Sequence, residues 1–170
     1  MNYLEYYVPE FDHEMQTTRA VLARVPEAHA EWRPHPKSTP LGQLAQHIAN
    51  LVGFGELILT ATERDVHPPG GSPVATVAFT TSEALLASFD LNVAATRAAL
   101  LRTPEADLLV PWSLKRQGVA FFTLPRAAVL RSFLLSHVIH HRGQLSVYLR
   151  LLDVPLPPIY GPTADEARRA

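Results

Sequence analysis

Apolar side chains recur at helical spacing in four blocks of the chain, which places them on one face of an α-helix in each block. The first block consists of Leu4, Val8, Phe11, Met15, Thr18, Leu22 and Val25. The second begins at Ser38-Thr39-Pro40, a hydroxyl cap followed by proline at the first helical position. It continues through Leu41, Leu44, Ile48, Leu51, Gly55 and Ile58, and we expect that helix to end near Glu63 or Arg64.

The other two blocks have the same spacing. Thr80-Thr81-Ser82-Glu83 has the pattern of a capping box. A third helix follows it, with Leu85, Leu86, Phe89, Val93, Thr96 and Leu100 on one face. The fourth block extends from Pro125 to Leu152 and contains Leu130, Leu134, His137, His141, Leu145, Tyr148 and Leu152 at helical spacing. Four helices with one apolar face each predict an all-α four-helix bundle, which we expect to form a single domain over residues 1–170.

Two connectors are long for a helix bundle. The one between the second and third helices contains the turn-rich sequence Pro68-Pro69-Gly70-Gly71-Ser72-Pro73. Between the third and fourth helices, residues 108–114 and 119–123 flank the polar sequence Lys115-Arg116-Gln117-Gly118. This pattern fits a short hairpin or an irregular packed loop.

Composition narrows the classes of function. With 47% hydrophobic and 18% charged residues, the chain is expected to be globular. A formal net charge of −1 offers no basic surface for a phosphate backbone, so we expect no nucleic-acid partner. The chain has no cysteine, which excludes thiolate metal sites and a cysteine nucleophile. We find neither a signal peptide nor an apolar run of the ~20 residues that span a bilayer, so we expect a cytoplasmic protein with no membrane partner.

The fourth helix carries the candidate chemistry in His137-Val138-Ile139-His140-His141. At about 100° per residue, His137 and His141 lie on the apolar stripe, and His140 lies at its edge. Two histidines at this spacing can offer two nitrogens to one metal ion. Arg142 is expected to point away from the stripe, as an anchor for a substrate carboxylate, a salt-bridge partner or a dimer contact.

A metal site needs a third ligand from another helix. His47 is the best candidate, because it lies beside the apolar stripe in the middle of the second helix. We expect His13 to face solvent.

The sequence thus predicts a site of His47, His137 and His141 with open coordination positions, as in catalytic sites. The alternative is that these histidines are hydrogen-bonded core residues. Gln144 lies on the same face and is expected to hydrogen-bond either a histidine or a loop.

The chain also resembles a known family in its motifs. The segment His137-x-x-His140-His141-Arg142-Gly143-Gln144-Leu145-x-x-Tyr148-Leu149-Arg150, with Pro158-Ile159-Tyr160-Gly161-Pro162-Thr163-Ala164-Asp165-Glu166 after it, resembles the C-terminal signature of DinB-like proteins. Leu44-x-x-His47-Ile48 and Trp32-Arg33-Pro34 resemble two further motifs of that family. The resemblance implies a bundle with up-down-down-up topology. It also implies a divalent metal ion, zinc or nickel, bound by the three matching histidines, and a homodimer.

Characterised DinB-like proteins include bacillithiol S-transferases and mycothiol-dependent maleylpyruvate isomerases. The resemblance therefore implies a bacterial enzyme in which the metal activates an external low-molecular-weight thiol toward an electrophile. Hydrolysis by a metal-bound water is one alternative, although Val138 stands where a His-Glu-x-x-His motif has its general base. A non-catalytic stress protein that binds a metal or ligand is another.

Four further groups of residues have two interpretations each. Arg33 and Tyr160 are expected to line the entrance to the site or to pack the first connector and the tail. Trp112 and the pair Phe121-Phe122 are expected to form a pocket wall or to cover the end of the bundle.

Overall fold

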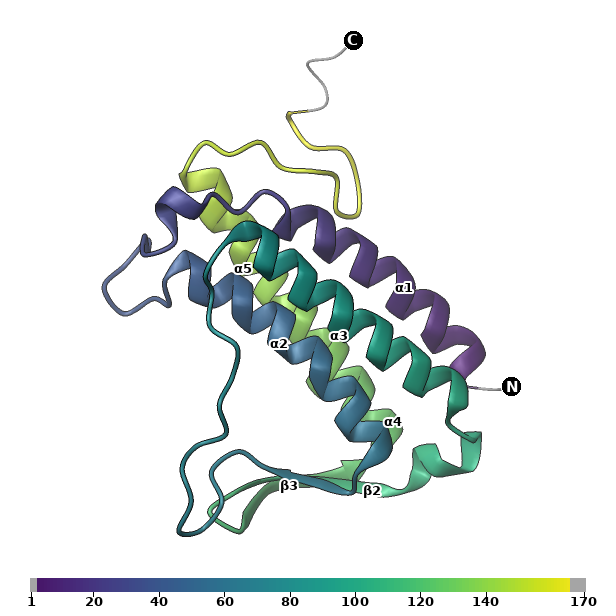
Figure 1. The fold of residues 1–170 in the computed structure, drawn as a ribbon. Helices are drawn as coiled ribbons and strands as arrows, with labels where there is room; N and C mark the ends of the chain where they lie inside the picture. Colours follow the sequence, from purple (N-terminus) through teal and green to yellow (C-terminus); the bar gives the residue numbers. More distant parts are fainter. Residues whose placement is uncertain (1–2, 166–170) are drawn as a thin grey trace.

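Four long helices form the body of the computed structural model, which describes residues 3–165 (Figure 1). They are α1 (Tyr3–Leu22), α2 (Leu41–Thr60), α3 (Ser82–Arg102) and α5 (Ser136–Leu151). The last is continuous with α4 (Arg126–Ala128) and with the π-helical segment η3 (Val129–Leu135). The short 3-10 helices are η1 (Glu27–His29) and η2 (Glu105–Leu109). The strands are β1 (Glu63–Asp65), β2 (Pro111–Arg116) and β3 (Val119–Pro125).

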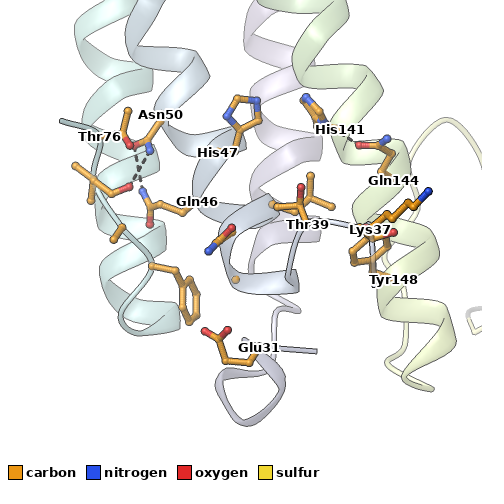
Figure 2. Close-up of a pocket in the computed structure, with 17 residues that line it drawn as sticks. Glu31, Lys37, Thr39, Gln46, His47, Asn50, Thr76, His141, Gln144 and Tyr148 are labelled. Carbon is orange, nitrogen blue, oxygen red and sulfur yellow. Dashed lines mark hydrogen bonds between the residues drawn. The ribbon is translucent and has the colours of Figure 1, made fainter. Parts of the chain in front are cut away.

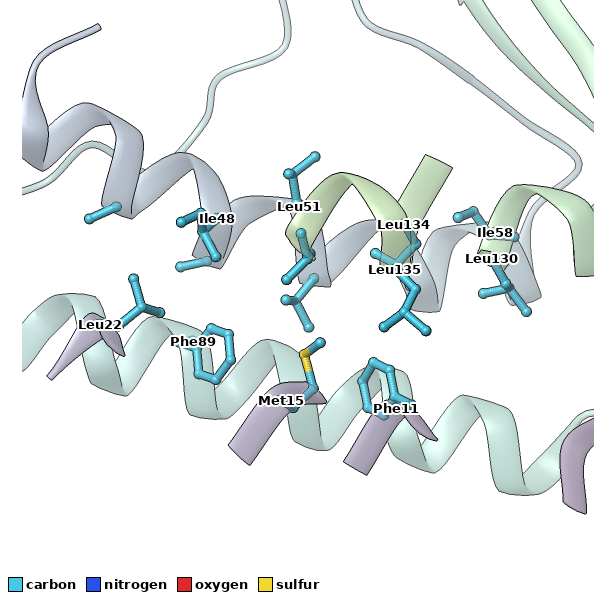
Figure 3. Close-up of a cluster of buried hydrophobic side chains, with 14 of the residues drawn as sticks. Phe11, Met15, Leu22, Ile48, Leu51, Ile58, Phe89, Leu130, Leu134 and Leu135 are labelled. Carbon is cyan, nitrogen blue, oxygen red and sulfur yellow. The ribbon is translucent and has the colours of Figure 1, made fainter. Parts of the chain in front are cut away.

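The helices have up-down-down-up topology, as the resemblance implies. In Figure 1, α1 and α5 run in one direction, and α2 and α3 run in the other. Helix α2 packs against α3 and α5, and α1 packs against the same two helices. Figure 3 shows the shared core, in which Phe11 and Met15 of α1 face apolar side chains of α2 and η3. The predicted four-helix bundle is confirmed.

The predicted helix boundaries are right at α3 and partly wrong at α2. Thr81 caps α3, because its side chain accepts a hydrogen bond from the Ala84 amide. Pro40 is itself the N-cap of α2 and makes no side-chain cap. The same helix ends at Thr60 instead of near Glu63, because residues 63–65 pair with β2.

A three-stranded sheet covers one end of the bundle, with β1 parallel to β2 and β2 antiparallel to β3 (Figure 1). The predicted hairpin is therefore present. Its turn residues, Gln117 and Gly118, both have positive φ, 52° and 76°, as a two-residue hairpin turn of this kind requires. The Asp65 carboxylate accepts hydrogen bonds from both turn amides, at 3.2 and 2.7 Å. Trp112 is fully buried and packs against Phe122, so these side chains cover the end of the bundle.

The prediction that Arg142 points away from the core is wrong. The buried stripe of α5 contains Arg142 together with Val138, Leu145 and Leu149, and Arg142 is 1% exposed. The prediction places Leu130 on the same face as His137 and His141 because it assumes α-helical turns throughout the fourth helix. The wider turns of η3 instead rotate Leu130 by roughly a quarter turn relative to α5. His137 and His141 are consequently half-buried at the border of the stripe.

A buried ion pair accounts for the position of Arg142. Its guanidinium lies 2.7 Å from a carboxylate oxygen of Glu14 on α1. It also donates to the Thr18 hydroxyl at 3.2 Å and to the Tyr160 hydroxyl at 2.7 Å. The Tyr160 hydroxyl in turn donates to the Glu14 carboxylate at 2.9 Å. Of the roles considered for Arg142, the structure shows a salt bridge.

Helix α3 is the one helix within residues 3–165 that is long and apolar enough, by length and composition, to cross a membrane. A bundle helix of a soluble protein can pass the same test. Leu85, Phe89 and Leu100 of α3 belong to the core of the bundle. Its Asp90 and Arg97 form salt bridges with α1. In this structure, α3 therefore packs as a bundle helix.

We expect Arg142→Met to lower the free energy of unfolding by about 3–5 kcal/mol, because it leaves the Glu14 carboxylate buried without its partner. Urea unfolding measures this loss, and Arg142→Met combined with Glu14→Gln should recover part of it. Arg150→Met is the matched control. Its side chain is 45% exposed in a surface pair with Asp165, so the cost should be about 0–1 kcal/mol. Equal losses in the two arginine variants would contradict the assigned role of Arg142.

Candidate metal centre

Three histidines from two helices meet on one side of the bundle. The Nε2 atoms of His137 and His141 lie 2.8 Å apart. The ring of His47, from α2, lies 5.5 and 4.7 Å from those two rings, measured between centroids. One candidate ligand atom from each residue lies within 4.8 Å of the others. Nitrogens bound to one tetrahedral zinc ion lie about 3.3 Å apart, so small side-chain rotations suffice. The structure thus brings together the three histidines singled out in the sequence.

The other ring nitrogen of His141 has an acceptor as its partner. His141 Nδ1 lies 2.7 Å from Gln144 Oε1, which confirms the expected contact with a histidine. An amide oxygen only accepts, so His141 Nδ1 carries the proton and its Nε2 keeps a lone pair. In the metal-free protein that lone pair accepts a hydrogen bond from His137 Nε2 at 2.8 Å when His137 carries its proton there. With its proton on Nδ1 instead, His137 offers a second Nε2 lone pair, and the donor set then fits a divalent metal ion.

The imidazoles are neutral at pH 7. Although His47 is exposed as a residue, desolvation of its ring, followed by the proximity of His141 and His137, lowers its pKa to about 4. Burial is also the main cause that lowers the pKa of His137 and of His141. Neutral rings keep the lone pairs that metal coordination needs.

The remaining candidate residues lie outside this cluster. His140 is exposed, with its ring 5.0 Å from that of His141, and is not part of the three-residue group. His13 is exposed on α1, as expected. Arg33 is exposed and does not line the adjacent cavity. Tyr160 fastens the tail to Arg142 and Glu14 instead of lining the entrance.

A cavity of about 920 Å³ opens beside His47 and His141 (Figure 2). Its walls come from the first half of α2, from Gln144 and Tyr148 of α5, from residues 37–39, and from residues 76–79 of the connector before α3. Residues 76–79 match no motif in the sequence. Among the described lining residues, Glu31 is the one carboxylate and Lys37 the one lysine. Figure 2 places Glu31 at the opposite end of the cavity from His47.

Comparison with known proteins agrees with this fold. The family model of the DinB superfamily matches residues 10–145, and the chain belongs to that superfamily. It is 24% identical over 164 residues to the uncharacterized protein YrdA of Bacillus subtilis, covering 96% of this chain and 91% of that protein.

Two solved structures are similar in fold. One is a DinB-like protein from Bacillus cereus, with a TM-score of 0.69 and 19% identity, covering 92% of this chain and 97% of the other. The other is the DinB-like protein YjoA from Bacillus subtilis, with a TM-score of 0.69 and 20% identity, covering 91% and 96%. At these identities, the likeness supports the fold alone.

The lowered pKa of His47 makes the stability of the metal-free protein depend on pH. The unfolded chain takes up the His47 proton below about pH 6.5, and the folded chain takes it up only near pH 4. Stability should therefore fall as the pH decreases between these values. Urea unfolding in the presence of a chelator, at pH 7 and pH 5, measures the loss. His47→Gln should show a smaller loss than the wild type, whereas His13→Gln, at an exposed histidine, should match the wild type. Identical losses in all three proteins would contradict the shifted pKa.

Proposed function

We propose that His47, His137 and His141 hold a divalent metal ion, zinc or nickel, with which the protein activates an external low-molecular-weight thiol for transfer to an electrophile. The observation that carries the proposal is the convergence of the Nε2 atoms of His137 and His141 with a third imidazole, that of His47, beside an open cavity. Because the chain has no cysteine, the thiol must come from a second molecule. The thiol-dependent transferases and isomerases that the sequence resembles support the same chemistry.

The protein's own residues position the reactants. A divalent ion held by three histidines supplies Lewis acidity that lowers the pKa of a bound thiol. Gln144 holds the tautomer of His141 that keeps its Nε2 lone pair free. The cavity beside His47 and His141 has room for the thiol and for an electrophile.

Thiol transfer is favoured over hydrolysis by what surrounds the histidines. A metal-bound water needs a nearby general base, which in metalloproteases is a glutamate next to the first histidine. That position is Val138 here, and it is buried. Glu31, the one carboxylate among the described cavity residues, lies at the far end from His47 (Figure 2).

The proposal extends to compartment and assembly. A reaction that consumes a reduced thiol fits the cytoplasm, where thiols are kept reduced. We also propose a homodimer, on the basis of the resemblance to DinB-like proteins. Light scattering on the purified protein tests the assembly.

Metal content tests the ligand set. Tag-free protein, purified without chelators or nickel resin, should contain about one equivalent of zinc or nickel per chain by elemental analysis. His47→Ala, His137→Ala and His141→Ala should each lose most of that metal, because two imidazoles bind it much more weakly than three. His140→Ala and His13→Ala should retain it. Unchanged metal content in His137→Ala would overturn the assignment of the site.

Thiol dependence tests the reaction. We expect the metal-loaded protein to consume 1-chloro-2,4-dinitrobenzene in the presence of cysteamine or cysteine, where the thiolate displaces chloride. Absorbance of the thioether product measures the rate, which should fall at least about tenfold in His141→Ala because the metal is lost. Loss of an ester substrate without any thiol would instead support hydrolysis. Metal binding without turnover of any thiol and electrophile pair would support a non-catalytic binding protein.

A further inference from the structure

One wall of the cavity contains an amide side chain that is almost completely buried. Gln46, next to His47 in α2, lines the cavity and is 3% exposed. Its Nε2 donates to Asn50 Oδ1 at 3.3 Å and to the hydroxyl of Ser88, on α3, at 3.4 Å. Both N–H groups of the amide are therefore occupied. Across the described residues, Gln46 Oε1 has no hydrogen-bond partner.

A backbone carbonyl fixes the orientation of this amide. Asn50 Nδ2 donates to the Val77 carbonyl at 2.8 Å, in the connector that forms the cavity wall. A carbonyl can only accept, so the amino group of Asn50 must face Val77 and its oxygen must face Gln46. The amino group of Gln46 must then face Asn50, as Figure 2 shows. Gln46 Oε1 is thereby turned away from Asn50 and presented to the cavity as a fixed acceptor.

The charged side chains around the cavity are compatible with a hydrogen-bond acceptor at Gln46. Among the described residues, Gln46 Oε1 is not one of the fully buried atoms that lack a partner, so it reaches the solvent of the cavity, where a ligand donor would replace water. Glu31, the one carboxylate among the described lining residues, adds negative potential. Lys37 lies toward α5, on the side of Gln144 and Tyr148, whereas Gln46 lies toward α3 (Figure 2).

We infer that Gln46 Oε1 binds a hydrogen-bond donor of the thiol substrate, an ammonium or hydroxyl group, and selects against a carboxylate at the same position. Two acceptor oxygens facing each other would repel, whereas an N–H or O–H group completes the hydrogen bonding of the amide. Asn50 acts through Gln46 and is a positioning residue. The inference rests on the proposed function, because it concerns the thiol that the metal would activate.

Matched thiols test the inference. Isothermal titration calorimetry on the zinc-loaded protein would use chains of two to six methylenes, with a thiol at one end and an amino, hydroxyl or carboxylate group at the other. At the chain length that reaches Gln46, we expect the amino or hydroxyl thiol to bind at least about tenfold more tightly than the carboxylate. Comparison of the amino thiols with the hydroxyl thiols shows which hydrogen-bond donor the site prefers.

Variants assign that preference to the amide. Gln46→Met, of similar size, should reduce the preference for donor over carboxylate to about twofold or less, because the acceptor is removed. Asn50→Ala should reduce it as well, because the amide of Gln46 becomes free to rotate. Gln16→Met, at an exposed position of α1, is the matched control and should keep the full preference. If Gln46→Met does not fold, Asn50→Ala decides.

The outcomes separate this inference from the proposed function. Equal affinity for donor and carboxylate thiols at every chain length overturns the inference alone. A preference that persists in Gln46→Met, or in Asn50→Ala, overturns it too. If thiols of all three kinds fail to bind the zinc-loaded wild type, the proposed function fails and this inference fails with it.

Discussion

The rotation of α5 about its own axis is set by a buried charge pair, and the geometry of the histidines depends on it. Arg142 must point inward to reach Glu14 on α1, since either charge alone would be costly in the core. His141 precedes Arg142 by one residue and is therefore turned by about 100° around the helix. That rotation takes His141 and His137 off the core face and toward α2, where His47 lies.

Helix α1 supports the site without taking part in it. None of its residues lines the cavity, yet its carboxylates pair with α3 through Asp12 and with α5 through Glu14. Arg19 of α1 adds a pair with Asp90 of α3. These contacts connect α1 to both neighbours of α2. The histidine cluster is formed by α2 and α5, and the cavity wall also includes the connector before α3.

Features set by neighbouring residues were predictable from the sequence. Helical periodicity located the four helices, and the hydroxyl before Ser82 marked the start of α3. His137 and His141, one turn apart, must share a face, so their pairing follows from spacing alone. The choice of His47 came from its position in α2 and from the family resemblance, and the structure places it beside the other two.

Features that depend on distant contacts were not predictable in the same way. The sequence predicts that the second helix reaches Glu63 or Arg64, but residues 63–65 pair with a strand about fifty positions later and α2 ends early. Residues 76–79 carry no periodicity and reach the cavity through the contact of Val77 with Asn50. Arg142 was placed on the wrong face because periodicity assumes uniform α-helical turns, and η3 departs from them.

The π-helical segment also contains one residue that the orientation of α5 does not require. Its wider turns place one more residue between Arg126 and His137 than regular α-helix would need for the same helical phase. Loss of a single residue within 129–135 would therefore convert this stretch to ordinary α-helix and keep His137 in the same phase relative to Arg126. Loss of a second residue from that regular helix would turn all that follows by about 100° relative to all that precedes. Related chains that are one residue shorter here should therefore keep the histidines in place, and chains that are two residues shorter should not.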